Sequence, residues 1–121
     1  MDKMILIAED EAIISIDLKR TLKGLGYSNV YTVHSASEAV TFALDSKPDL
    51  ILMDINFNEP LNGVEAASSI KSKIDIPIIF VSAYSPDIFS KALKELEGMP
   101  LVSKPVITSE LCRKINEAFN I

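Results

Sequence analysis

The sequence has few of the residues that disulfide-rich or zinc-binding domains depend on. Cys112 is the only cysteine in 121 residues, which excludes an internal disulfide. His34 is the only histidine, so cysteine and histidine cannot provide the ligand set of a structural zinc site. A protein without disulfides fits a reducing compartment, and we expect a cytoplasmic protein.

Positive charge and long hydrophobic runs are also scarce. The chain has 12 Lys and Arg residues against 17 Asp and Glu residues, a formal net charge of −5. No long-range positive field exists to attract nucleic acid or an anionic membrane surface, so we expect direct binding to neither. The apolar run at residues 4–8 ends at Glu9 and is too short to span a membrane.

What the sequence does contain is the composition of a globular domain. Hydrophobic residues make up 48% of the chain and charged residues 24%, so we expect one domain over residues 1–121. Short runs of Ile, Leu, Val and Met recur between segments of helical periodicity, an alternation typical of a parallel sheet with crossover helices. These runs are residues 4–8, 30–33, 50–53, 78–81 and 101–103. The second is more mixed than the others and is predicted near an edge of the sheet.

Helix signals fill the intervals between the runs. The first helix is expected to end near Gly24 and Gly26. The second begins with capping-box spacing at Ser35 to Glu38, and the third begins near Gly63. The fourth is predicted over residues 85–98 and the fifth from an N-cap at Thr108. This order predicts an α/β fold, a doubly wound (βα)5 sandwich that binds ligands at the carboxyl ends of its strands.

Acidic residues follow two of the predicted strands directly. Glu9 and Asp10 follow the first strand and Asp54 follows the third. Two carboxylates about 4 Å apart repel each other by about 4 kcal/mol at an effective dielectric constant of about 20, so such a cluster calls for a cation. Oxygen ligands without His or Cys favour Mg²⁺. In a simpler interpretation, these acids cap the following helices and face water.

Two further polar residues are predicted at the same edge. Ser82 follows the fourth strand and Lys104 follows the fifth. A carboxylate nucleophile, a divalent metal, a lysine and a hydroxyl group are what phosphoryl transfer requires, because its transition state needs charge neutralisation and in-line positioning.

These residues, in this order, resemble the receiver domain of two-component response regulators. The resemblance covers nearly the whole chain and implies a flavodoxin-like fold with a five-stranded parallel sheet of order 2-1-3-4-5. The motifs that carry it are residues 7–11 (IAEDE), 52–56 (LMDIN), 62–67 (NGVEAA), 77–83 (PIIFVSA) and 103–105 (SKP).

The resemblance also implies roles for individual residues. Asp54 would accept a phosphoryl group from the phosphohistidine of a sensor histidine kinase or phosphotransfer protein. Asp10 and Asp54 would bind Mg²⁺, Glu9 would bind it through water, and the backbone carbonyl of Asn56 would complete the protein's share of the ligands. Ser82, Lys104 and the backbone N–H of Ala83 would contact the phosphoryl group, with the Lys104–Pro105 peptide cis.

Three positions depart from the family pattern. Leu101 occupies the place of the usual aromatic switch residue, three positions before the lysine. The loop over residues 56–63 is one residue longer than the common form and has Asn62 where Asp is frequent. Ser82 replaces the commoner Thr.

The leading hypothesis is therefore a phosphorylation-dependent signalling switch of a phosphorelay, which is no enzyme beyond its own phosphorylation and dephosphorylation. A pseudo-receiver that binds proteins without phosphate is the alternative, and a hydrolase of the haloacid dehalogenase type is disfavoured because its nucleophile follows the first strand. The output domain or target is unknown. A homodimer could use the face of the fourth helix, fifth strand and fifth helix. We expect His34 to be solvated or capping and Cys112 to be a packing residue.

Overall fold

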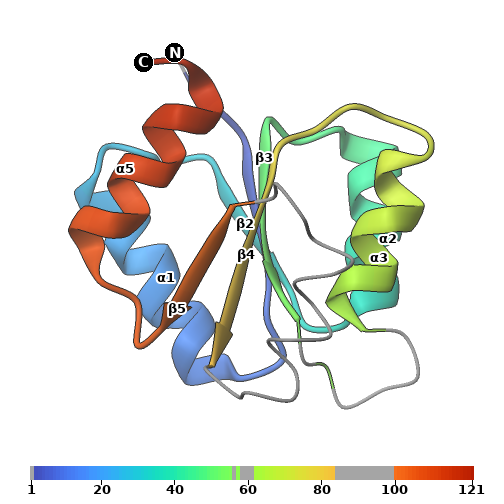
Figure 1. Cartoon of the computed structure of the whole chain (residues 1–121), viewed down its shortest axis with the longest axis horizontal. Helices are drawn as coiled ribbons and strands as arrows, with labels where there is room; N and C mark the ends of the chain where they lie inside the picture. The colour runs from blue at the N-terminus through green and yellow to red at the C-terminus, as the bar shows by residue number, and fades with distance from the viewer. Residues whose placement is uncertain (1, 56, 58–61, 84–99) are drawn as a thin grey trace.

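The computed structural model describes residues 2–55, 57, 62–83 and 100–121. From β1 to β4, strands and helices alternate as the sequence predicts (Figure 1). The elements are β1 (Ile5–Ala8), α1 (Ala12–Gly24), β2 (Val30–Val33), α2 (Ala36–Ser46), β3 (Leu50–Asp54), α3 (Gly63–Lys71), β4 (Ile78–Ala83), β5 (Leu101–Lys104) and α5 (Thr108–Phe119).

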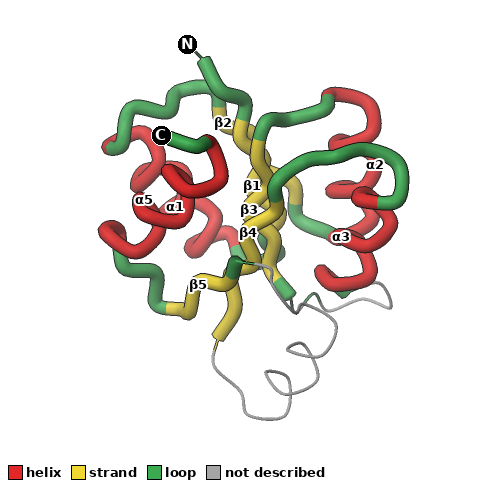
Figure 2. Tube along the Cα trace, turned by 45° about the horizontal axis from the view of Figure 1, so that its top comes forward, coloured by secondary structure: helices red, strands yellow, loops and turns green. Residues whose placement is uncertain are grey.

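The sheet is parallel and has the order β2-β1-β3-β4-β5. Helices α1 and α5 cover one face, and α2 and α3 cover the other (Figures 1 and 2). This is the flavodoxin-like architecture that the sequence predicts, with β2 at an edge. Its order reverses beside β1, so the carboxyl ends of β1 and β3 lie next to each other at the switch point where such sheets bind ligands.

The strands of the sheet are apolar because helices bury both of their faces. In β1, Ile5 and Ile7 pack in the core under α1 and α5, whereas Leu6 and Ala8 pack in the core under α2 and α3. None of the four is more than 1% exposed. Burying an aliphatic side chain of this size contributes about 1.5–3 kcal/mol, so β1 is a rigid base for the polar residues that follow it.

Two helix starts differ in detail from the sequence prediction. At the start of α2, the Ser35 hydroxyl oxygen accepts a hydrogen bond from the backbone N–H of Glu38 at 3.1 Å, as predicted. The reciprocal capping box is at the start of α3, between Asn62 and Glu65. The prediction of Thr108 as the N-cap of α5 is wrong. The chain is still extended at Ile107, which is the N-cap, so Thr108 already lies in the first helical turn.

Several predictions fall outside the described residues: the fourth helix, the metal ligand Asn56 and most of the loop that follows it. Cys112 is half-buried on α5, where its sulfur lies 3.8 Å from the side-chain nitrogen of Asn116. In the part of the chain that the structure describes, no helix combines the length and the apolar character needed to cross a membrane.

Candidate functional site at the carboxyl ends of the strands

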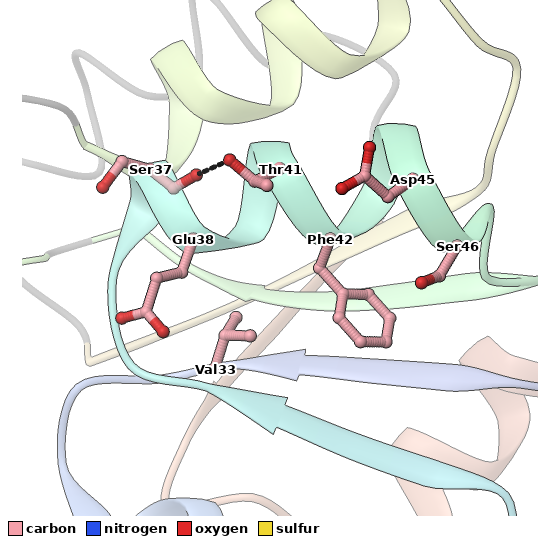
Figure 3. Close-up of a pocket in the computed structure, with 7 residues that line it drawn as sticks. All are labelled: Val33, Ser37, Glu38, Thr41, Phe42, Asp45 and Ser46. Carbon is pink, nitrogen blue, oxygen red and sulfur yellow. Dashed lines mark hydrogen bonds between the residues drawn. The ribbon is translucent and has the colours of Figure 1, made fainter.

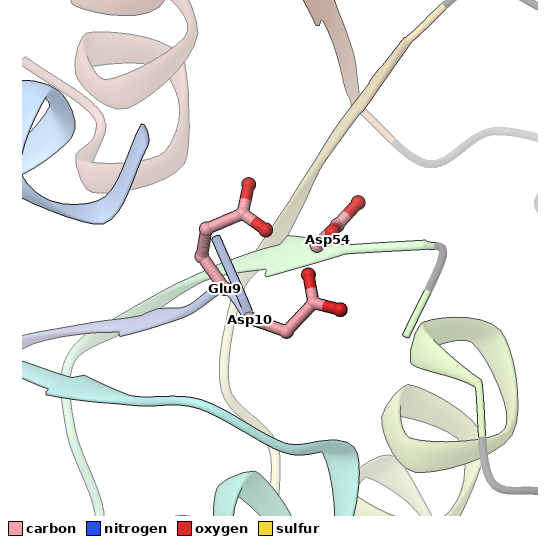
Figure 4. A group of neighbouring side chains, drawn as sticks. All are labelled: Glu9, Asp10 and Asp54. Carbon is pink, nitrogen blue, oxygen red and sulfur yellow. The ribbon is translucent and has the colours of Figure 1, made fainter. Parts of the chain in front are cut away.

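Three carboxylates meet where β1 and β3 end. Ala8 and Met53 are paired in register, so the next residues, Glu9 and Asp54, lie side by side at the ends of β1 and β3. Oxygen atoms of Glu9, Asp10 and Asp54 lie within 4.8 Å of one another (Figure 4). Glu9 and Asp54 are only 1% and 4% exposed. Three acids this close destabilise one another in the absence of a neutralising cation.

Lys104 supplies a positive charge from the far edge of the sheet. It ends β5, and its Nζ lies 2.6 Å from Oε1 of Glu9 and 3.5 Å from Oδ1 of Asp54. Its side chain is 13% exposed, so these pairs are largely shielded from solvent. A charge-assisted hydrogen bond of this length is strong, and it fixes the ammonium group beside the Asp54 carboxylate.

The protonation equilibria of this pair reflect both burial and pairing. Burial raises the pKa of Glu9, but hydrogen bonding with Asp54 and Lys104, the charge of Lys104 and the backbone N–H of Glu11 together place that pKa below its usual range. Burial lowers the pKa of Lys104, but the hydrogen bond to Glu9 and the negative charges of Asp54 and Glu9 raise it overall. Glu9 and Lys104 are therefore both charged at neutral pH.

Ser82 lies at the same end of the sheet. Val81 pairs with Asp54 and Ser82 pairs with Ser103, the residue before Lys104. Ser82 is 5% exposed and belongs to β4, which lies between the strands that carry Asp54 and Lys104. The Lys104–Pro105 peptide is cis, as predicted.

Buried carboxylates, a lysine and a serine at the ends of β1, β3, β4 and β5 are the arrangement that the sequence predicts for a receiver. The response regulator receiver domain family matches the chain over residues 5–116. The chain belongs to this family.

Longer regulators are among the relatives of this receiver domain. It is 36% identical over 116 residues to the transcriptional regulatory protein PdtaR of Mycobacterium tuberculosis. The aligned region covers 96% of the chain and 56% of PdtaR. It is 34% identical over 115 residues to the phyllosphere-induced regulator PhyR of Methylorubrum extorquens, which covers 94% of the chain and 42% of PhyR. The chain thus spans only part of the curated relatives it matches.

Solved structures share the fold over nearly the whole receiver domain. The signal receiver domain of a modulated diguanylate cyclase from Desulfovibrio desulfuricans G20 is 30% identical, with a TM-score of 0.86 and coverage of 99% of this chain and 95% of that one. The REC domain of PhyR from Erythrobacter litoralis is also 30% identical, with a TM-score of 0.83 and coverage of 99% and 92%.

Gly63 is a positioning residue that sequence reasoning placed only at a helix start. A Cβ atom at this position would lie 1.8 Å from the backbone oxygen of Asp54 and 2.9 Å from Cα of Ile55. The Gly63 N–H also donates to the carbonyl of Ile55 at 2.9 Å. The start of α3 therefore rests directly on the backbone that carries Asp54. The sequence feature that could have indicated this contact is a glycine between the two capping-box residues Asn62 and Glu65. A glycine is needed where another backbone segment comes too close for a side chain.

Among the residues that the structure describes, two pockets lie on opposite sides of the sheet. A groove of about 520 Å³ runs between α1 and the segment after β5 and is open to Lys104; it is lined by Glu11, Ile14, Asp17, Leu18, Thr21, Lys104, Pro105 and Val106. A second, of about 420 Å³, lies between α2 and β2, where Phe42 and Val33 point into the same space (Figure 3). The first groove shares Lys104 with the acidic site.

Proposed function

We propose that this receiver domain accepts a phosphoryl group on Asp54, with Mg²⁺ bound, from the phosphohistidine of a sensor histidine kinase or phosphotransfer protein. The observation that carries the proposal is the convergence of Glu9, Asp10, Asp54 and Lys104 at one end of the sheet. The domain acts as a switch and has no catalytic role beyond its own phosphorylation and dephosphorylation. The low cysteine content supports a cytoplasmic location.

The donor set fits a hard divalent cation. All three side chains offer carboxylate oxygens, the ligands that Mg²⁺ prefers. Asp10 and Asp54 would hold the ion directly. Glu9 would act through water, since its Oε1 is already bonded to Lys104, and the backbone carbonyl of Asn56 would add a further ligand. Bound Mg²⁺ would neutralise negative charge that develops on the phosphoryl oxygens.

The protein's own residues would carry out the transfer. A carboxylate oxygen of Asp54 attacks phosphorus, a new O–P bond forms, and the P–N bond to the donor histidine breaks, leaving the electron pair on the imidazole. Lys104 lies close enough to Asp54 to bind an oxygen of the incoming group, and Ser82 would donate its hydroxyl to another.

The signal would pass from the site to β5, which begins at Leu101. Leu101 is partly buried against the core under α2 and α3, where the family resemblance leads us to expect an aromatic ring. The response would therefore rely on apolar repacking rather than on ring rotation. A separate output domain or target protein would sense this repacking. The face of the fourth helix, β5 and α5 would be the surface for a homodimer. We expect this acidic domain not to bind nucleic acid directly.

The pseudo-receiver remains the alternative, because Leu101 departs from the family pattern. It predicts no response to metal. In contrast, a receiver that binds Mg²⁺ should melt at a higher temperature in its presence. At a free Mg²⁺ concentration about ten times its Kd, binding stabilises the native state by about 1.4 kcal/mol, which raises Tm by roughly 5 °C. Asp10→Asn should abolish most of the shift and Asp45→Asn, on α2, should retain it; a wild-type Tm unaffected by millimolar Mg²⁺ would favour the pseudo-receiver.

A phosphoryl mimic should perturb the site and the strands behind it. With Mg²⁺ and beryllofluoride, we expect larger amide shifts at residues 82–83 and 100–104 than in α1 and α2, because Ser82 and Lys104 gain new contacts. Ser82→Ala should weaken the response while Asp54 still binds the mimic. Two-dimensional NMR measures these amide shifts. Changes limited to Glu9, Asp10 and Asp54 would contradict the proposal that the signal passes through Ser82 and Lys104.

A further inference from the structure

The only histidine of the chain directly follows the edge strand, next to the acidic site. Glu9 is held by this edge strand through its backbone, because its N–H donates to the carbonyl of Val33 at 3.0 Å. On the other side of the same residue, Nδ1 of His34 lies 3.0 Å from the carbonyl oxygen of Glu9. Both backbone polar groups of Glu9 therefore bond to the end of β2.

The bond defines the state of the ring. A carbonyl oxygen can only accept a hydrogen bond, so Nδ1 of His34 carries the proton. In a longer parallel ladder the backbone N–H of Ser35 would be the next donor to the carbonyl oxygen of Glu9, and Nδ1 of His34 occupies that position here. The imidazole thus extends the ladder by one bond beyond the end of the strand.

We propose that His34 is a positioning residue for the metal-binding acids, acting through the backbone of Glu9. Fixing this peptide directs the Glu9 carboxylate toward Lys104. It also sets the direction in which Asp10 leaves the strand, beside Glu9 and Asp54 (Figure 4). Ligands held in place before the ion arrives lose less conformational freedom on binding it. This inference rests on the proposed Mg²⁺ binding and adds a residue to it.

The first test needs no metal. In untagged protein with ¹⁵N-labelled histidine, the single imidazole can be observed without overlap. In mildly alkaline buffer, two-bond ¹H–¹⁵N spectra should show a protonated Nδ1 and an unprotonated Nε2. The opposite tautomer would overturn the proposal, because Nδ1 could then not donate to Glu9.

The second test compares Mg²⁺ affinity by titration followed by amide shifts. His34→Ala should raise the Kd about threefold to tenfold, the range expected from losing one hydrogen bond. His34→Asn should restore most of the affinity, because its amide nitrogen is separated from Cα by the same number of bonds as Nδ1. Tyr31→Ala is the matched control on β2. Tyr31 is 45% exposed, and its ring packs on that of Phe42 with the ring centroids 5.5 Å apart, so the variant should lower Tm and leave the Kd unchanged.

The outcomes separate the two proposals. If the wild type binds no Mg²⁺, the proposed function fails. If the wild type binds and His34→Ala binds equally well, the role of His34 is wrong and the proposed function stands. A loss of affinity that Tyr31→Ala shares in proportion to its Tm would also overturn the role, because it would show a general effect of edge-strand stability.

Discussion

Asp54→Ala is expected to take no phosphoryl group from acetyl phosphate and Mg²⁺, whereas the wild-type chain gains one. Asp54 is the proposed nucleophile, and alanine has no oxygen to form the new bond to phosphorus. Its carboxylate is also the member of the acidic cluster that lies 3.5 Å from Lys104. Intact-mass spectrometry gives the result directly.

The matched control is Asp45→Ala. Asp45 lies on α2 beside the second pocket, away from the acidic site, so this variant should be labelled as the wild type is. Continued labelling of Asp54→Ala would move the acceptor to another residue and remove the basis for the assigned roles of Ser82 and Lys104.

Gly63→Ala is expected to destabilise the fold by about 2 kcal/mol or more, because an overpacked contact costs about 1–3 kcal/mol and here the opposing atom cannot rotate away. The new Cβ would lie 1.8 Å from the backbone oxygen of Asp54, so α3 and β3 must separate. The change should also slow phosphorylation, since the displaced backbone carries the acceptor. Urea unfolding measures the stability.

Gly24→Ala provides the control for this glycine. Gly24 is the last residue of α1, and apart from its chain neighbours and the adjacent backbone of α1, no atom lies within 4 Å of the position that a Cβ would take. Alanine is favoured over glycine in helices by about 1 kcal/mol, so this variant should be neutral or more stable. Equal unfolding midpoints for the two variants would contradict the packing argument.

The sequence was sufficient to predict the strands and the end of the sheet that carries the chemistry. Residues that follow buried parallel strands must meet at one edge, so Glu9, Asp54, Ser82 and Lys104 could be grouped before their contacts were known. The strand order was predicted from the family resemblance, and the sheet has that order.

What the sequence could not provide were contacts that depend on three-dimensional approach. Lys104 has a long side chain whose partner is set by the sheet geometry, and its bond to Glu9 joins residues 95 positions apart. The closeness of Gly63 to Asp54 depends on how α3 docks. The bond from His34 to Glu9 depends on the exact point at which β2 turns into α2, which periodicity does not locate.

The most direct test of the central claim is the mass of the wild-type chain after incubation with acetyl phosphate, measured with Mg²⁺ and with the metal chelated. The proposed function predicts a gain of one phosphoryl group with Mg²⁺ and none in the presence of the chelator, because the acidic site needs a cation to accept a further negative group. An unchanged mass in both samples would contradict it and favour the pseudo-receiver. Equal labelling in both samples would contradict the role of the metal.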